Sequence, residues 1–145
     1  MLITYFIAAT DEEAARTLEW VGGPADPDEG EALPAVDADF EPSVQLGALL
    51  ELLVGEEEAA ELEDDLIAMG DDGERTVTRL DDQARDLLAE TGREDLDRVA
   101  PQWAGIEEFF GMADPEGLAD QADRLAALAR QARAEGRGLY CWAVV

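Results

Sequence analysis

The chain has 145 residues, of which 47% are hydrophobic, and its 36 acidic and 10 basic residues give a net charge of −26. This apolar share is too high for a disordered chain, so the length predicts a single domain over residues 1–145. The charge repels nucleic acid and anionic membranes, and no apolar run approaches the roughly 20 residues that cross a bilayer. The start, MLITYFIAATDEE, lacks the basic region of a signal peptide, which predicts a cytoplasmic protein.

The first part of the chain predicts a strand, a helix, a long loop and a second helix. Residues 2–9 are an apolar run typical of a strand covered on both faces. TDEE, residues 10–13, is a capping box that predicts a helix to about Val21. Residues 23–42, with four prolines and two glycines, predict a functional or mobile loop in which AVDADF could form an edge strand. From about Ser43, leucines at helical spacing predict the next helix.

The segment GEEEAAELEDD, residues 55–65, opens a predicted helix that ends near Gly70. A period of 100° per residue places a set of apolar side chains on its inner side: Ala59, Leu62, Leu66 and Met69. The same period gathers five acidic side chains on the outer side: Glu57, Glu58, Glu61, Asp64 and Asp65. We interpret this outer arc first as a solvated helix face and, if it has a function, as a surface for a basic protein partner.

The second half of the chain predicts two strands and three helices. ERTVTRL, residues 74–80, is typical of a strand, and Asp81 then caps a helix. Apolar and aromatic residues at helical spacing predict a further helix packed into the core: Leu96, Val99, Trp103, Ile106 and Phe110. Asp114 and Pro115 mark the start of a last helix that ends at Gly136, and LYCWAVV forms a final apolar strand.

These elements predict an α+β fold: a small sheet of three or four strands packed with about five helices. Because the first and last strands are apolar on both faces, we expect them to be central and adjacent. Four segments, taken in order, carry a resemblance: LITYFIAATDEEAARTLEW, LGALLELLVG, RTVTRLDDQARDLLAE and ARAEGRGLYCWAVV. This pattern resembles the YfbM-like family of uncharacterised bacterial proteins. The resemblance implies the fold and no reaction. The family typically carries Trp and His around the apolar helix, whereas residues 43–55 contain neither, so no role of those groups is carried over.

The composition removes most catalytic chemistry. The chain has no His and no Lys, so the commonest general base, Schiff-base chemistry and a P-loop are excluded. Ser43, the only serine, has no His or Lys to activate it as a nucleophile. Cys141, the only cysteine, lies in an apolar strand, where burial raises a thiol pKa. Zinc lacks its usual ligands, and DPDEGE, residues 26–31, fails the EF-hand spacing. We therefore predict no enzymatic activity, catalytic residue, metal or cofactor, with a carboxylate-based or metal-dependent enzyme as the least favoured alternative.

The charge is unevenly distributed, and this suggests a function. Residues 1–74 hold 22 of the 36 acids and only one base, Arg16, whereas residues 75–145 hold 14 acids and nine Arg. We predict an acidic module that docks a basic protein partner, as an inhibitor or immunity protein would. Trp20 and Phe40 flank the long loop and are predicted as exposed anchors for this partner. In the alternative hypothesis the domain has an unknown ligand-binding or regulatory role, and its acidity is host background, which the missing Lys and Asn also suggest.

Overall fold

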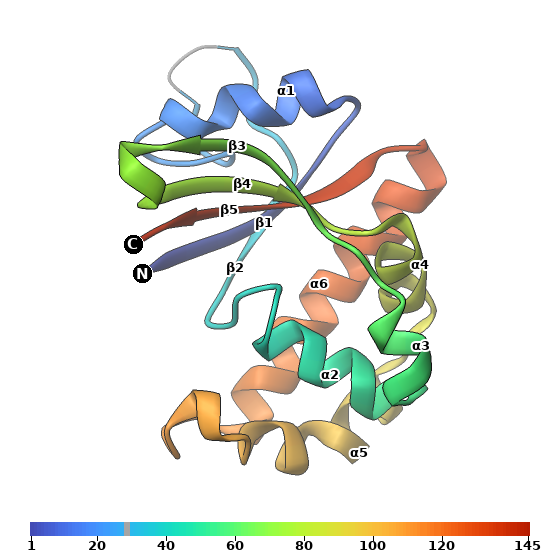
Figure 1. Ribbon diagram of the computed structural model, residues 1–145. Helices are drawn as coiled ribbons and strands as arrows, with labels where there is room; N and C mark the ends of the chain where they lie inside the picture. Colours follow the sequence, from blue (N-terminus) through green and yellow to red (C-terminus); the bar gives the residue numbers. More distant parts are fainter. Residues whose placement is uncertain (28–29) are drawn as a thin grey trace.

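The computed structural model describes residues 1–27 and 30–145. Across these residues the fold is α+β, as predicted, with one antiparallel sheet in the order β2-β1-β5-β4-β3. The strands are β1 (Leu2–Ala8), β2 (Ala35–Ala38), β3 (Asp65–Gly70), β4 (Arg75–Arg79) and β5 (Gly138–Val144). The helices are α1 (Asp11–Arg16), α2 (Gln45–Val54), α3 (Glu56–Ala60), α4 (Asp82–Glu90), α5 (Arg93–Ala104) and α6 (Pro115–Glu135). Figure 1 shows α1 on one side of the sheet and α2 to α6 on the other.

The strands β1 and β5 lie side by side in the interior of the sheet, which confirms the prediction for the first and last strands. They pair antiparallel along their whole length, from Leu2 opposite Val144 to Ala8 opposite Gly138. Both strands are apolar on both faces because the sheet is covered on both sides. The described sheet has five strands rather than the predicted three or four, because residues 65–70 add a strand at one edge.

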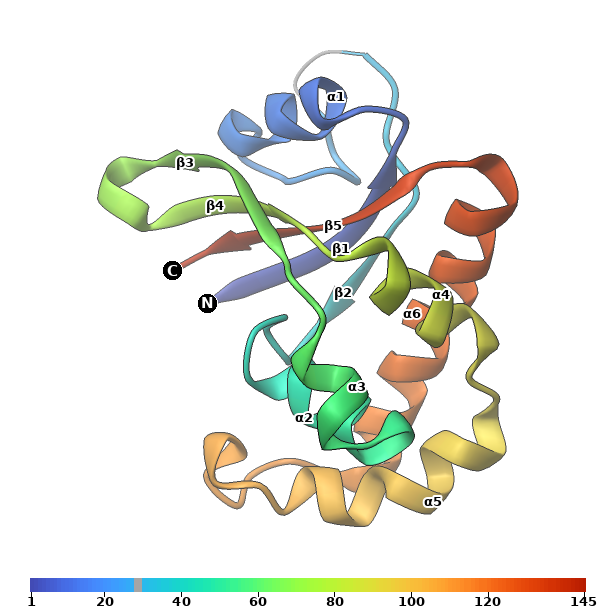
Figure 2. The ribbon, with the colours of Figure 1, turned by 45° about the vertical axis from the view of Figure 1, so that its right-hand side comes forward.

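Two apolar cores lie against opposite faces of the sheet. Figure 2 shows the helices that lie on the two sides of the sheet. In the larger core, on the side of α2 to α6, the ring of Phe40 lies 5.1 Å from that of Trp103 and 5.5 Å from that of Tyr5, measured between centroids. The Tyr5 hydroxyl donates to the Phe40 carbonyl at 2.9 Å, so the polar end of this buried ring is satisfied. The smaller core, on the side of α1, contains Phe6 and Trp142.

Two aromatic residues correct the sequence interpretation. Phe40 is fully buried in the larger core, so its prediction as an exposed anchor is wrong. The chain leaves β2 and turns its Phe40 ring inward, where Tyr5 and Trp103 enclose it. Phe110, predicted to face the core, is instead 83% exposed. The helix α5 ends at Ala104, so the helical period does not extend to Phe110. Phe110 itself has a left-handed backbone, with a φ of 53°.

Residues 55–70 differ most from the prediction. The helix α3 ends at Ala60, and β3 occupies the second half of the stretch. A continuous helix would place like charges at neighbouring positions on its surface, which is unfavourable. The strand β3 instead pairs with β4 through a tight turn, in which Asp71 and Asp72 have φ values of 50° and 56°. Such positive φ values suit a hairpin turn rather than a helix.

Most helix starts follow their sequence signals. Thr10 accepts a hydrogen bond from the Glu13 amide at 3.1 Å. The helix that it caps stops at Arg16 and continues only as a 3-10 turn over Thr17–Glu19, so it is shorter than predicted. Asp81 and Asp114 cap α4 and α6, as predicted, and Gly136, with a φ of 67°, is the C-cap of α6.

The start of α2 is held by a carboxylate that the sequence interpretation missed. One oxygen of Glu41 accepts hydrogen bonds from the amides of Val44 and Gln45 at 2.6 and 2.7 Å. The other oxygen accepts from the amide of Ser43 at 2.7 Å and from its hydroxyl. A single side chain thus satisfies several amides that the first turn of a helix leaves without partners.

Candidate functional site

The edge strand β3 extends beyond the helical layer. The sheet registers place Leu66 and Met69 on the same face as the buried Tyr5 and Cys141, which is the face that α4 and α6 cover. These two helices contact β1, β2 and β5, whereas the helical contacts of β3 come mainly from α1 and the turn after it, on the opposite face. Leu66 and Met69 are therefore 56% and 61% exposed. The β3–β4 hairpin projects away from α5 and α6 (Figures 1 and 2).

The outer edge of β3 has no strand beside it within the described residues. The strand pairs with β4 on its inner side, with a bulge between Leu66 and Ala68. No hydrogen bond joins residues 65–70 to any other described part of the chain. An edge of this kind presents free backbone amides and carbonyls and is a template for a further strand.

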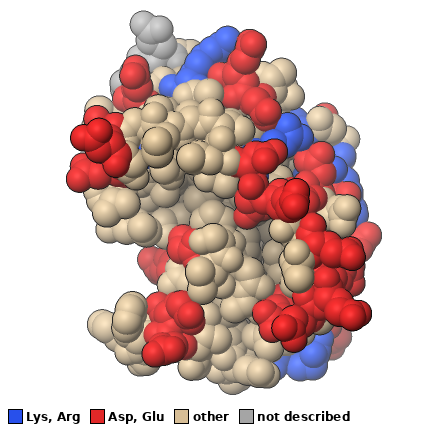
Figure 3. Space-filling model, viewed as in Figure 1, with Lys and Arg blue, Asp and Glu red and all other residues tan. Residues whose placement is uncertain are grey.

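Carboxylates flank β3 at both ends: Glu56, Glu57, Glu58, Glu61, Glu63, Asp64, Asp65, Asp71, Asp72 and Glu74. We call β3 together with these carboxylates the acidic edge. Within the part of the chain that the structure describes, Asp71 alone among them forms an ion pair, at 3.9 Å from Arg75. Figure 3 shows acidic side chains over α3 and at the tip of the β3–β4 hairpin. The negative field of the acidic edge is therefore little neutralised from within.

Asp64 ties the acidic edge to the start of α4. Its carboxylate accepts a hydrogen bond from the Asp81 amide at 3.0 Å, and the Asp81 carboxylate accepts one from the Glu63 amide at 2.9 Å. Desolvation raises the pKa of Asp64, and the nearby carboxylates of Asp81, Asp65 and Glu41 raise it further, against the lowering effect of the hydrogen bond. Asp64 is thus a structural group held in an unfavourable electrostatic environment.

The structure brings five of the predicted partner-binding residues into one region, although not onto one helix face. Glu57 and Glu58 lie on α3, and Glu61 is its C-cap. Asp64 and Asp65 lie on the link into β3 and at its first position. The apolar pair Leu66 and Met69 was missed, because both residues were assigned to the buried side of a helix. The sixth predicted residue, Phe40, is in the core, as described above.

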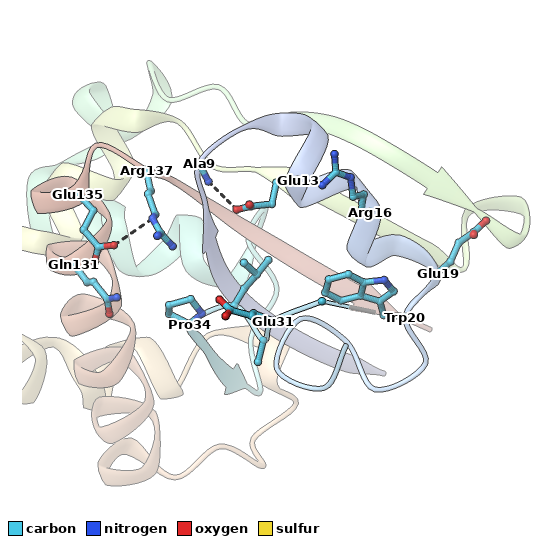
Figure 4. A pocket seen from close by; sticks show the side chains of 13 residues that line it. Ala9, Glu13, Arg16, Glu19, Trp20, Glu31, Pro34, Gln131, Glu135 and Arg137 are labelled. Atoms are coloured by element: carbon cyan, nitrogen blue, oxygen red, sulfur yellow. Dashed lines mark hydrogen bonds and ion pairs between the residues drawn. The ribbon is translucent and has the colours of Figure 1, made fainter. Parts of the chain in front are cut away.

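Trp20, the remaining predicted anchor, is half-buried. Its carbonyl accepts a hydrogen bond at 3.0 Å from Arg75, the arginine that pairs with Asp71, so its backbone lies near the end of β3. It lines an open depression of about 970 Å³ between α1, the chain before β2 and the end of α6 (Figure 4). Charged side chains of both signs surround this depression: Glu13, Arg16, Glu19, Glu31, Glu135 and Arg137. Several are already engaged, since Glu135 pairs with Arg137 at 3.2 Å and Glu13 accepts from the Ala9 amide at 3.1 Å. The depression offers room for a small molecule but no single charge preference.

The single thiol of the chain, on Cys141, is enclosed in the core. Cys141 is buried, as predicted, and burial raises its pKa, so it is not a thiolate at neutral pH. Among residues 1–27 and 30–145, no group of three or more Cys, Asp or Glu side chains is arranged to hold a metal ion. None of the helices described there is both long and apolar enough to cross a membrane.

No protein-family model matches the chain, and no curated protein or solved structure is significantly similar to it. The resemblance to the YfbM-like family therefore stays a prediction.

Proposed function

We propose that this protein is a non-enzymatic binding module whose acidic edge docks a basic protein partner. The observation that carries the proposal is the edge strand β3, with Leu66 and Met69 exposed between carboxylates of which, within the described residues, only Asp71 pairs with an arginine. Apolar contact with these two side chains would supply affinity, and the surrounding charge would supply orientation and selectivity. An inhibitor or immunity-like protein directed at a basic enzyme or toxin is a role of this kind.

Long-range electrostatics supports such a role. A net charge of −26 attracts basic proteins, speeds their association and repels nucleic acid. Charge–charge attraction is screened over about 8 Å at physiological ionic strength, so binding through the acidic edge would weaken as salt is added. We further propose that the module acts in the cytoplasm as a single domain over residues 1–145.

The test compares two variants of equal charge. In the first, four acids of the acidic edge are neutralised: Glu56→Gln, Glu57→Gln, Glu58→Gln and Glu61→Gln. In the control, four exposed acids outside it are neutralised: Glu94→Gln, Glu107→Gln, Glu108→Gln and Glu116→Gln. Each protein is immobilised and exposed to extract of its native host at low salt. We expect the wild type and the control to retain the same basic protein and the first variant to lose it. Equal retention by all three would contradict the proposal.

The depression beside Trp20 supports a second candidate function, the binding of a small ligand. Its volume of about 970 Å³ lies at the upper end of the range usual for ligand pockets, and an indole forms part of its wall. In this case the acidity of the chain is host background. Thermal-shift screening of small molecules tests it: a shift that Trp20→Ala abolishes would favour this function. Unrelated proteins of the same genome that are equally acidic and poor in Lys would weaken the first proposal.

A further inference from the structure

We propose that the partner contributes an extended segment that adds to the outer edge of β3 as a sixth strand, with basic residues at both ends and apolar residues between them. This inference rests on the proposed function and specifies its binding mode. The strand β3 has six residues, so the added segment would pair over about 20 Å. Main-chain hydrogen bonds to a free edge give such a complex its affinity, and alternate side chains give it its specificity.

The two faces of β3 are unequally covered, and this sets the side-chain pattern of the segment. On the side of α1, Leu18 lies against Gly70, and Ile67 and Ala68 belong to the smaller core. On the other side, Leu66 and Met69 are exposed. Every second residue of an added strand would project onto this open side, where side chains directly opposite on neighbouring strands have Cβ atoms about 4.5–5.5 Å apart. Apolar side chains at those positions would cover Leu66 and Met69.

The ends of β3 set the charges of the segment. Asp64 and Asp65 lie at its start, and Asp71 and Asp72 follow its end. Arginine or lysine at both ends of a segment of about the same length would meet carboxylates that, with the exception of Asp71, form no ion pair within the described residues. Pairing at both ends would also oppose slippage of the register, which a free edge alone does not fix.

A second copy of this chain is the competing occupant, and the charge argues against it. If two β3 strands paired antiparallel across a two-fold axis, Asp65 of one copy would lie near Asp71 and Asp72 of the other. Each copy also carries a net charge of −26. Like charges opposite one another destabilise a strand pair. The bulge between Leu66 and Ala68 further interrupts a flat edge-to-edge contact.

The probe is the peptide acetyl-Arg-Arg-Val-Thr-Val-Thr-Val-Arg-Arg-amide, tested with two N-methylated forms of it. One form carries methyl groups on the alternate amides of one edge of the extended peptide, and the other form carries them on the opposite edge. All three peptides have the same charge, but an added strand uses the amides of one edge only. Binding to the full chain is measured by calorimetry at low salt, and hydrogen exchange of the β3 amides is followed by NMR.

We expect the parent peptide and one methylated form to bind with similar affinity and the other form to bind about tenfold or more weakly. The amides on the outer edge of β3, which do not pair with β4, should become protected from exchange only when a peptide binds. Leu66→Thr with Met69→Thr, which keeps the charge, should weaken binding of the parent peptide, whereas Met112→Thr, at an exposed apolar site in the segment after α5, should not.

Three results would overturn strand addition. Equal binding of all three peptides, lost in the variant with Glu56, Glu57, Glu58 and Glu61 changed to Gln, would mean that charge alone recruits the partner, and the proposed function would survive. Protection of the outer-edge amides of β3 in the free protein, at the mass of a dimer, would assign the edge to a second copy. Absence of peptide binding, together with retention of the same host proteins by both charge variants, would remove strand addition and the proposed function together.

Discussion

Glu41 shows how one side chain can fix the start of a helix. It accepts hydrogen bonds from three consecutive amides, those of Ser43, Val44 and Gln45. Burial alone would raise its pKa, but these hydrogen bonds and that of the Ser43 hydroxyl outweigh burial, so the pKa is lowered. The sequence predicted the helix start near Ser43 correctly. It did not identify Glu41 as the cap, because Glu41 lies four residues before the first helical residue, Gln45, whereas an N-cap residue directly precedes the helix.

We expect Glu41→Ala to lower the free energy of unfolding by about 1–3 kcal/mol at pH 7, measured by urea denaturation. Glu41→Gln retains one acceptor oxygen and should cost less. Because the folded-state pKa of Glu41 is lowered, its stabilising effect is complete above the unfolded-state pKa of about 4.3 and is lost as the pH falls through the folded-state value. The difference between wild type and Glu41→Gln should therefore shrink in acid. A difference that stays constant from pH 7 to pH 3 would show that the charge has no part in the cap.

Phe40 and Phe110 make a matched pair, because the same substitution should lower the free energy of unfolding strongly at one position and hardly at the other. Phe40 is fully buried between two rings, so Phe40→Ala should lower the free energy of unfolding by about 3–5 kcal/mol. Phe110 is 83% exposed, and Phe110→Ala should change it by no more than about 0.5 kcal/mol. Urea denaturation of both variants provides the measurement. Similar losses in the two would contradict the burial described here.

At the scale of elements, the sequence predicted those whose signals are local. The apolar runs at 2–9 and 139–145 became β1 and β5, and the caps Asp81 and Asp114 began α4 and α6. The edge strand at AVDADF is β2. Each of these rests on a pattern that has one structural meaning, either an apolar run bounded by turns or a capping residue before a periodic segment.

Apolar periodicity did not identify the strand β3, because its bulge gives the apolar residues the spacing of a helix. In a regular strand, residues three apart point to opposite faces. The bulge between Leu66 and Ala68 returns Leu66 and Met69 to the same face, opposite Thr78 and Thr76 of β4. Two apolar residues three positions apart on one face are also typical of a helix, so the periodicity wrongly predicted a helix here. The turn signal at Asp71–Gly73 would have favoured a hairpin.

The link between α3 and β3 gives a prediction at the same scale. Asn in place of Asp64 can still accept the hydrogen bond of the Asp81 amide, but it removes a charge that faces three other carboxylates. We expect Asp64→Asn to raise the free energy of unfolding at pH 7 by a few tenths to about 1 kcal/mol, and Asp64→Ala to give less because it removes the acceptor.

The pH dependence of this variant follows from the raised pKa of Asp64. A carboxyl group whose pKa is raised in the folded state costs no stability below its unfolded-state pKa, about 3.9, and costs progressively more as the pH rises through the folded-state value. The gain from Asp64→Asn should thus be present at pH 7 and vanish near pH 3 in thermal denaturation. A gain of equal size at both pH values would have to come from packing.

For the whole molecule, we expect repulsion among the carboxylates to outweigh the ion pairs, which seven of the ten arginines form within the described residues. Most of these pairs lie in the second half of the chain, whereas the acidic edge has almost none. We expect the melting temperature to rise as NaCl is added from low ionic strength to about 0.5 M, since salt screens exposed charges. The variant with four neutralised acids at Glu56, Glu57, Glu58 and Glu61 should start higher and rise less. A flat or falling melting temperature would mean that the ion pairs dominate.

The central pairing of β1 with β5 has a consequence for how the protein folds. The β3–β4 hairpin closes a turn of a few residues, but Ala8 must find Gly138 across nearly the whole chain. Closing so long a loop before its contacts form slows folding, and we expect pulse-labelling hydrogen exchange to protect β3–β4 before β1. During synthesis β1 emerges long before its central neighbour exists. An apolar strand is therefore without its central neighbour until the end of synthesis, and we expect the nascent protein to be more prone to aggregate than the finished one.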